Sequence, residues 1–132
     1  MAAILVIDDE PDIRTLLRRT LELNGHQVAE AENGIEGCVV AADVRPVLVI
    51  TDVLMPEREG VETIVELRKI VPEVKIVAIS GGGRVRNMMF LDIAQQAGAD
   101  AVLQKPFLPK DLVALVSRLL PAAPAGGDDG RG

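Results

Sequence analysis

Short apolar runs alternate with longer amphipathic segments along the chain as far as about residue 120. A few consecutive apolar residues that end in a polar residue are typical of a buried strand, and apolar residues three or four positions apart are typical of a helix. Strand and helix patterns that alternate in this way predict an α/β fold, a doubly wound parallel sheet with helices on both faces. Five strands are predicted, over residues 3–8, 27–31, 47–51, 75–79 and 101–104.

The predicted helices have recognisable signals at their ends. Pro11 suits the first position of the first helix, because its missing N–H needs no partner there, and Asn24-Gly25 ends that helix. The later helices are predicted over residues 34–43 and 61–71, over a segment that includes residues 88–97 and is closed by Gly98, and over residues 109–120.

The spacing of apolar residues also predicts which side of each helix faces the core. A helix that turns such a stripe toward the sheet buries it and leaves its charged residues in water. In the first helix the predicted core stripe comprises Ile13, Leu16, Leu17, Thr20 and Leu21. In the second it comprises Ile35, Cys38, Val39 and Ala42.

Length and composition narrow the class of protein. The 132 residues suit a single domain, which we expect over residues 1–120, followed by a disordered tail over residues 121–132 that lacks apolar periodicity. A net charge of −6 argues against direct binding to nucleic acid, which needs clustered Lys and Arg. Cys38 is the single cysteine, and the chain has no signal sequence and no apolar run long enough for a membrane helix, so we expect a cytoplasmic protein.

Reactive side chains stand where the predicted strands end. Asp8 and Asp9 follow the first strand, Asp52 the third, Ser80 the fourth and Lys105 the fifth. In an open parallel sheet, functional groups gather beyond the carboxyl ends of the strands. We therefore expect three carboxylates, a hydroxyl and an ammonium group to share one site.

The chemistry of this set indicates phosphoryl transfer. Crowded carboxylates repel one another unless a cation is present, and a site built from oxygen ligands suits Mg²⁺. Mg²⁺ takes few carboxylates and retains sites for phosphate oxygens. Lys105 would neutralise one phosphoryl oxygen and Ser80 would donate a hydrogen bond to another. Asp52 is then the candidate nucleophile, because a carboxylate forms an acyl phosphate.

These residues give the chain a specific resemblance over about residues 3–120. It resembles the receiver domain of bacterial two-component response regulators, and the resemblance implies a flavodoxin-like, CheY-like sheet with strand order 2-1-3-4-5. The segments that carry it are Asp8-Asp9, Asp52 with Met55-Pro56 and Gly60, Ser80-Gly81, Gly98-Ala99-Asp100, and Lys105-Pro106-Phe107.

The resemblance also implies roles for individual residues. Asp52 would accept a phosphoryl group from a phosphohistidine on a sensor histidine kinase or a histidine phosphotransfer protein. Mg²⁺ would be bound directly by Asp9, Asp52 and the backbone carbonyl of Leu54, with Asp8 acting through water. Such a domain catalyses only its own phosphorylation and dephosphorylation, so we expect a signalling switch and not an enzyme.

The switch itself is implied to depend on Ser80 and Lys105, which would contact the phosphoryl group, and the Lys105-Pro106 bond is expected to be cis. Val102 stands at the switch position where the family usually has Tyr or Phe. Output is expected to be phosphorylation-dependent binding of a downstream protein by a stand-alone receiver.

Two other functions are compatible with parts of the pattern. Val102 in place of an aromatic ring leaves open a receiver-fold scaffold that binds partners without phosphorylation. A phosphohydrolase with an aspartyl intermediate is disfavoured, because the chain lacks the Asp-x-Asp nucleophile motif of that class and a cap domain.

Overall fold

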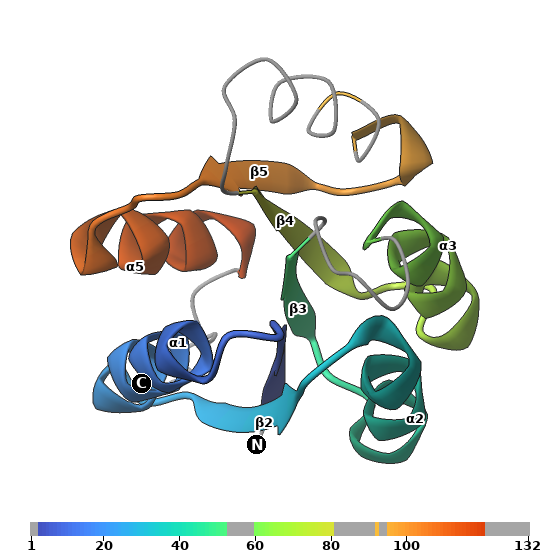
Figure 1. Ribbon diagram of the computed structural model, residues 1–132, viewed down its shortest axis with the longest axis horizontal. Helices are drawn as coiled ribbons and strands as arrows, with labels where there is room; N and C mark the ends of the chain where they lie inside the picture. The colour runs from blue at the N-terminus through green and yellow to red at the C-terminus, as the bar shows by residue number, and fades with distance from the viewer. Residues whose placement is uncertain (1–2, 53–59, 81–91, 93–94, 121–132) are drawn as a thin grey trace, which may run out of the picture.

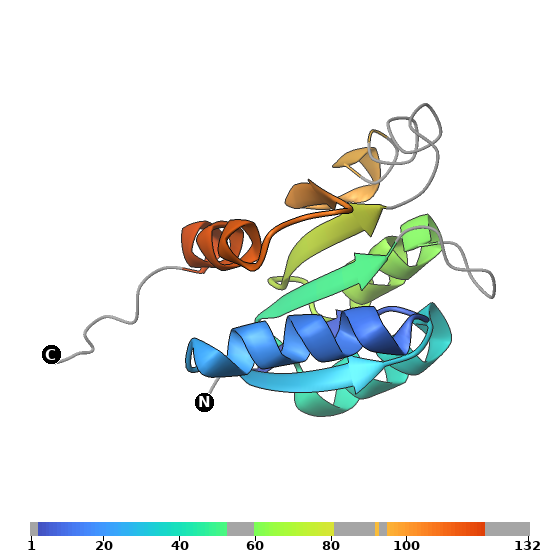
Figure 2. The same cartoon turned by 60° about the vertical axis from the view of Figure 1, so that its left-hand side comes forward.

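The structure is a computed structural model that describes residues 3–52, 60–80, 92 and 95–120. Its centre is a sheet with the order β2-β1-β3-β4-β5, in which every neighbouring pair of strands is parallel. The prediction of a doubly wound parallel sheet and the strand order 2-1-3-4-5 are confirmed (Figures 1 and 2). The strands are β1 (Ala3–Ile7), β2 (Gln27–Ala31), β3 (Leu48–Asp52), β4 (Lys75–Ser80) and β5 (Ala101–Gln104).

Helices cover both faces of the sheet, with α1 and α5 on one face and α2 and α3 on the other (Figure 1). Side chains along a strand alternate between the two faces, so β1 supplies Leu5 and Ile7 to the core beneath α2 and α3, and Ile4 and Val6 to the core beneath α1 and α5. Both cores consist of buried aliphatic side chains, most of them without any exposed surface. The helices are α1 (Pro11–Leu23), α2 (Gly34–Val44), α3 (Gly60–Ile70) and α5 (Pro109–Leu119).

The end signals predicted for α1 are confirmed. Pro11 is its first residue, and Gly25, with φ +89°, follows its C-terminus in the left-handed region. Leu17, Thr20 and Leu21 are buried as predicted, but Leu16 is 38 % exposed. The predicted stripe was therefore too wide on the side of Leu16.

The predicted core face of α2 was wrong for Ile35, Val39 and Ala42, which are all exposed. The buried residues are Gly34, Gly37 and Ala41, with Cys38 partly buried against the core as expected. The reason is close packing. A Cβ atom on Gly37 would lie 2.9 Å from Cγ1 of Ile7 and closer still to its Cδ1. The helix sits so near β1 that its smallest residues must face inward.

A single arginine ties α3 to two loops at the amino-terminal edge of the sheet. The guanidinium of Arg68 donates to the backbone carbonyls of Val74 (2.5 Å) and Gly98 (2.6 Å) and to the carboxylate of Asp100 (3.0 Å). The same carboxylate oxygen of Asp100 accepts the backbone N–H of Ile76 at 2.8 Å. These bonds fix the start of β4 against the loop before β5.

The helix predicted around residues 88–97 lies mostly outside the described residues, as does the tail from residue 121. Gly98 has φ +120°, which agrees with its predicted place at the end of that segment. In the described part of the chain, every helix is too short or too polar to cross a membrane.

Candidate functional site

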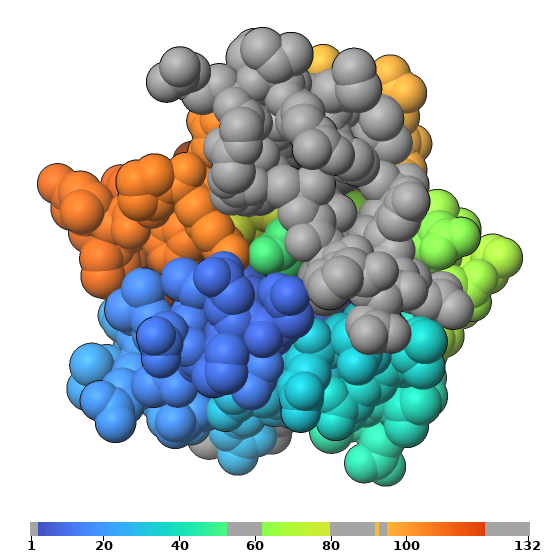
Figure 3. Space-filling model, in the orientation of Figure 1, coloured from blue at the N-terminus to red at the C-terminus, as the bar shows by residue number. Residues whose placement is uncertain are grey.

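The carboxyl ends of β1, β3 and β5 bring three predicted side chains together. Asp8 follows β1 directly, Asp52 is the last residue of β3, and Lys105 follows β5. Because the strands are parallel, their ends meet at one edge of the sheet. Figure 3 shows a small green patch from the region of β3 at the surface, between the blue start of the chain and the orange segment near its end.

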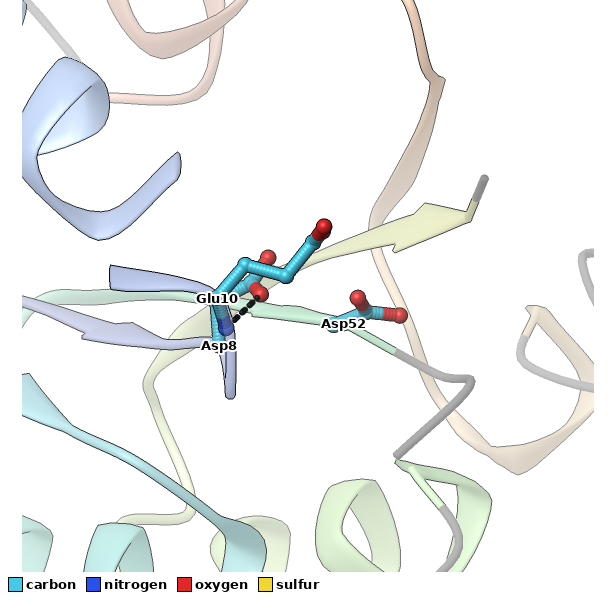
Figure 4. Close-up of side chains that lie close together, drawn as sticks. All are labelled: Asp8, Glu10 and Asp52. Carbon is cyan, nitrogen blue, oxygen red and sulfur yellow. Dashed lines mark hydrogen bonds between the residues drawn. The ribbon is translucent and has the colours of Figure 1, made fainter. Parts of the chain in front are cut away.

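The ammonium group of Lys105 lies among three carboxylates. Its Nζ is 2.9 Å from Oε1 of Glu10, 3.1 Å from Oδ2 of Asp52 and 3.2 Å from Oδ2 of Asp8. The Lys105-Pro106 bond is cis, as predicted. Figure 4 shows the carboxylates of Asp8, Glu10 and Asp52 close together, two from the β1–α1 junction and one from the end of β3.

Asp8 is fully buried and held on several sides. Its backbone N–H donates to the carbonyl of Ala31 at 3.2 Å, and its own carbonyl accepts a hydrogen bond from Nη1 of Arg14 at 2.7 Å. Its Oδ1 accepts the backbone N–H of Glu10 at 2.9 Å. Burial, and to a smaller extent the nearby charge of Asp52, raise the pKa of Asp8 to about 6, against the lowering effect of the Glu10 N–H and of Lys105.

Lys105 is held in its charged form by the same neighbours. Burial alone would lower its pKa, but the hydrogen bond to Glu10 and the charges of Asp52 and Asp8 outweigh burial and raise it well above its usual value. An ammonium group thus balances one of the three negative charges in its surroundings.

The acidic cluster fits a divalent cation. Asp8, Glu10 and Asp52 each offer an oxygen within 4.8 Å of the other two. Oδ2 of Asp8 is buried and accepts no hydrogen bond from the described residues, although Lys105 is near it. An all-oxygen cluster with unused acceptor capacity suits a hard ion such as Mg²⁺.

Glu10 was not among the predicted site residues. The sequence pattern assigned it to the start of α1 beside Pro11, and it does precede that helix as its N-cap. The run Asp8-Asp9-Glu10 after a buried strand was the available signal, since it places a third carboxylate directly beside the two that were predicted.

The remaining predicted site residues, Asp9, Val102, Ser80 and Leu54, are not seen in the cluster around Lys105 in the described part of the structure. Asp9 is exposed and is not part of the three-carboxylate cluster. Val102 is partly buried in β5, packed against the core beneath α2 and α3. Ser80 ends β4, with its backbone opposite Gln104, but its side chain and the carbonyl of Leu54 lie outside the described parts of the structure.

Comparison with known proteins identifies the family. The family model of the response regulator receiver domain matches residues 4–117. The chain belongs to this family. The receiver is 36 % identical to the response regulator MprA of Mycobacterium sp. strain KMS over 117 residues, which cover 89 % of this chain and 50 % of MprA. It therefore spans about half the length of the curated relatives that it matches.

Solved receiver structures have the same fold. The chemotaxis protein CheY4 of Vibrio cholerae matches 91 % of this receiver and 99 % of its own chain, with a TM-score of 0.81 and 29 % identity. A response regulator of Burkholderia pseudomallei matches 96 % of the receiver and 70 % of its own chain, with a TM-score of 0.78 and 25 % identity. That structure was determined with a phosphorylated aspartic acid, a calcium ion and citrate. The predicted resemblance to two-component response regulators is thus confirmed.

Proposed function

We propose that this receiver is a phosphorylation switch in which Asp52 accepts a phosphoryl group from a phosphohistidine, with Mg²⁺ as the cofactor. The observation that carries the proposal is the position of Lys105, whose Nζ is 3.1 Å from Asp52 at the end of β3. An ammonium group beside a buried carboxylate is placed to neutralise charge on a group that becomes attached to that carboxylate.

In the proposed reaction a carboxylate oxygen of Asp52 attacks the phosphorus atom of the phosphohistidine. A P–O bond forms, the P–N bond breaks, and the imidazole leaves with the electron pair of that bond. Asp52 is almost fully buried, so water is largely excluded and the charge of Lys105 acts strongly on the transferred group. The product is an acyl phosphate on Asp52.

Within the proposed site, Mg²⁺ would offset the negative charge of the carboxylates and of the incoming phosphoryl oxygens. Asp9, Asp52 and the backbone carbonyl of Leu54 are proposed as its direct ligands, and Asp8 is proposed to act through water. The hydroxyl of Ser80 is proposed to donate a hydrogen bond to the phosphoryl group. Support for a cation comes from the oxygens of Asp8, Glu10 and Asp52, which lie within 4.8 Å of one another.

Phosphorylation would then change the partners of Lys105. The lysine now contacts Glu10, Asp52 and Asp8, and a phosphoryl group on Asp52 would draw it away from some of them. Phosphorylation can shift the equilibrium between two conformations of the receiver only if the phosphoryl group makes different contacts in each of them. We propose that this difference, together with Ser80, alters the surface for a downstream protein and that the domain turns over no separate substrate.

The proposed partners are a sensor histidine kinase or a histidine phosphotransfer protein on the input side. The phosphorylated aspartic acid in the Burkholderia pseudomallei relative supports an aspartyl acceptor. A cytoplasmic location stays a prediction. Function as a stand-alone receiver also stays a prediction, because the chain spans about half the length of its curated relatives.

The direct test is incubation with acetyl phosphate and Mg²⁺, followed by intact mass measurement. The wild type should gain one phosphoryl group, and Asp52→Asn should gain none. Asp43→Asn, which removes an exposed carboxylate from α2, is the matched control and should be phosphorylated like the wild type. Full phosphorylation of Asp52→Asn would contradict the site assignment.

A scaffold that binds partners independently of phosphorylation is the alternative. The observation that favours it is the aliphatic Val102 in β5 at the switch position. It requires that the wild type gain no phosphoryl group from acetyl phosphate or from a phosphohistidine donor, while Asp52→Asn retains partner binding.

A further inference from the structure

Ile35 and Val39, two large apolar residues of α2, point toward solvent, whereas Val40 of the same helix packs against the core. Ile35 is 54 % exposed and Val39 is 68 % exposed, and Ala42 is also exposed. These residues follow an i, i+4, i+7 spacing and so form one stripe along the helix. In Figure 3 the cyan and teal surface of α2 lies on the outside of the molecule.

The fold does not need apolar residues in this stripe. The contact between α2 and the sheet is made by the small residues Gly34, Gly37 and Ala41, above all Gly37 against Ile7, together with the partly buried Cys38 and Val40. Polar side chains at positions 35 and 39 would leave that contact intact. An apolar stripe that is bordered by charged residues and serves no core is typical of a binding surface.

The border of this stripe is negative. Glu32 precedes the helix, and Glu36 and Asp43 lie along it beside Ile35 and Val39, all three exposed. Within the described residues, none of these three carboxylates forms an ion pair. The basic residue closest in sequence is Arg45, at the C-cap of α2.

A small open pocket of about 170 Å³ lies at the amino-terminal end of the stripe. It is lined by Arg14, Glu30, Ala31, Glu32 and Glu36. The carboxylate of Glu30 is already paired with Arg14 at 3.3 Å and with Arg18 at 2.8 Å. Oε1 of Glu36 accepts the backbone N–H of Glu32 at 2.7 Å, but within the described residues neither carboxylate forms an ion pair, so their charges can attract one further cationic side chain into the pocket.

We propose that this outer face of α2, formed by Ile35, Val39, Ala42, Glu32, Glu36 and Asp43, binds a basic amphipathic helix of a partner protein. Apolar residues of the partner would cover Ile35 and Val39, its Lys or Arg side chains would face the carboxylates, and one of them would enter the pocket. The proposal does not depend on phosphorylation of Asp52.

The charge pattern favours such a partner over a second copy of this chain. In a two-fold dimer through this face, each copy would present the same patch to the other. The carboxylates would then meet carboxylates, and like charges across an interface are unfavourable. The net charge of −6 of the chain adds to this repulsion.

The test uses the full chain and a synthetic helical peptide with Leu along one face and Lys along the other. Amide chemical shifts recorded by ¹⁵N NMR during titration should change along α2. The dissociation constant should rise at least tenfold, or about 1.4 kcal/mol, in Ile35→Gln/Val39→Gln, and should also rise in Glu32→Gln/Glu36→Gln and with added salt. Leu23→Gln removes an equally apolar side chain, 87 % exposed on α1, and should leave binding unchanged.

Several results would overturn the proposal. These are absence of binding, equal binding of a peptide with Glu in place of Lys, or shifts that the Ile35→Gln/Val39→Gln variant leaves unchanged. Sedimentation velocity that shows a dimer of the wild type but not of this variant would identify a second copy as the occupant instead. Thermal unfolding of each variant verifies that it remains folded.

Discussion

The side-chain nitrogen of Lys105 lies 3.1 Å from a carboxylate oxygen of Asp52, and the same nitrogen also contacts Asp8 and Glu10. One positive charge therefore occupies the space among three negative ones. A metal ion that binds these carboxylates meets a cation already in place. Lys105 and the metal should compete electrostatically, whereas both favour a phosphoryl group on Asp52.

Lys105→Met should consequently bind Mg²⁺ more tightly than the wild type. Removal of one positive charge close to a divalent cation favours binding, and screening by solvent limits the gain, so we expect the affinity to rise by at least about tenfold, or about 1.4 kcal/mol. Isothermal titration calorimetry at low ionic strength measures it. Lys110→Met, which removes an exposed lysine of α5, should change the affinity little. Weaker Mg²⁺ binding in Lys105→Met would refute the competition.

The buried carboxyl of Asp8 should make the metal-free receiver more stable in mild acid. Its pKa is about 6 in the folded state against 3.8 for an ordinary aspartate, so the folded state binds the proton more tightly than the unfolded one. Stability attributable to Asp8 should rise as the pH falls through about 6 toward 4 and stay low above 6, a difference of up to about 3 kcal/mol.

Asp8→Asn tests this linkage, because an amide carries no charge. In EDTA at neutral pH the variant should unfold at higher urea concentration than the wild type, and the two curves should converge as the pH falls below about 6. Added Mg²⁺ should stabilise the wild type more than the variant. An Asp8→Asn protein that is less stable than the wild type at every pH would contradict the assigned pKa.

Gly37→Ala should destabilise the fold even though alanine favours helices by about 1 kcal/mol. The added Cβ would overlap the buried side chain of Ile7, and we expect a net loss of about 1–2 kcal/mol in the free energy of unfolding. Urea denaturation measures it. Ile7→Val removes the Cδ1 atom at the overlap, so Gly37→Ala should cost less in that background. Equal costs in both backgrounds would show that the overlap is not the cause.

Arg68→Ala should destabilise the fold by about 2 kcal/mol, because the backbone carbonyls of Pro72, Val74 and Gly98 and the Asp100 carboxylate lose a charged donor. Arg68→Lys should restore only part of this stability, since one ammonium group does not reproduce the forked guanidinium. Lys69→Ala, a change at the neighbouring exposed lysine, is the control and should stay within about 0.5 kcal/mol of the wild type. A small effect of Arg68→Ala would mean that water replaces the guanidinium at these groups.

The sequence pattern predicted the sheet and its reactive edge because both depend on strongly periodic features. Buried strands such as β3 are apolar without interruption, and parallel strands necessarily carry Asp8, Asp52 and Lys105 to one edge. The position of these three residues at one edge of the sheet does not depend on the details of side-chain packing. For the same reason, the sequence alone was enough to predict that Asp8, Asp52 and Lys105 lie together.

The inward face of α2 was not predictable by the same reasoning. The spacing of apolar residues favours Ile35 and Val39 over Gly37 as core residues, because it depends on hydrophobicity alone. It contains no information on the distance between the helix and the strand. Only the structure shows how closely α2 approaches Ile7. Glu10 was missed for a related reason, since its contact with Lys105 joins residues far apart in the sequence.

Hydrogen bonds to Ala31 and Arg14 fix the backbone of Asp8, and this rigidity affects the free energy of cation binding. A carboxylate anchored in this way has little freedom to turn toward solvent, so its desolvation is a standing cost of the folded state. A cation bound at this carboxylate compensates part of the free energy of desolvation, and this compensation contributes to the measured affinity for the cation. Loosening the anchor, for example with Arg14→Ala, should therefore weaken cation binding even though Arg14 is itself positively charged.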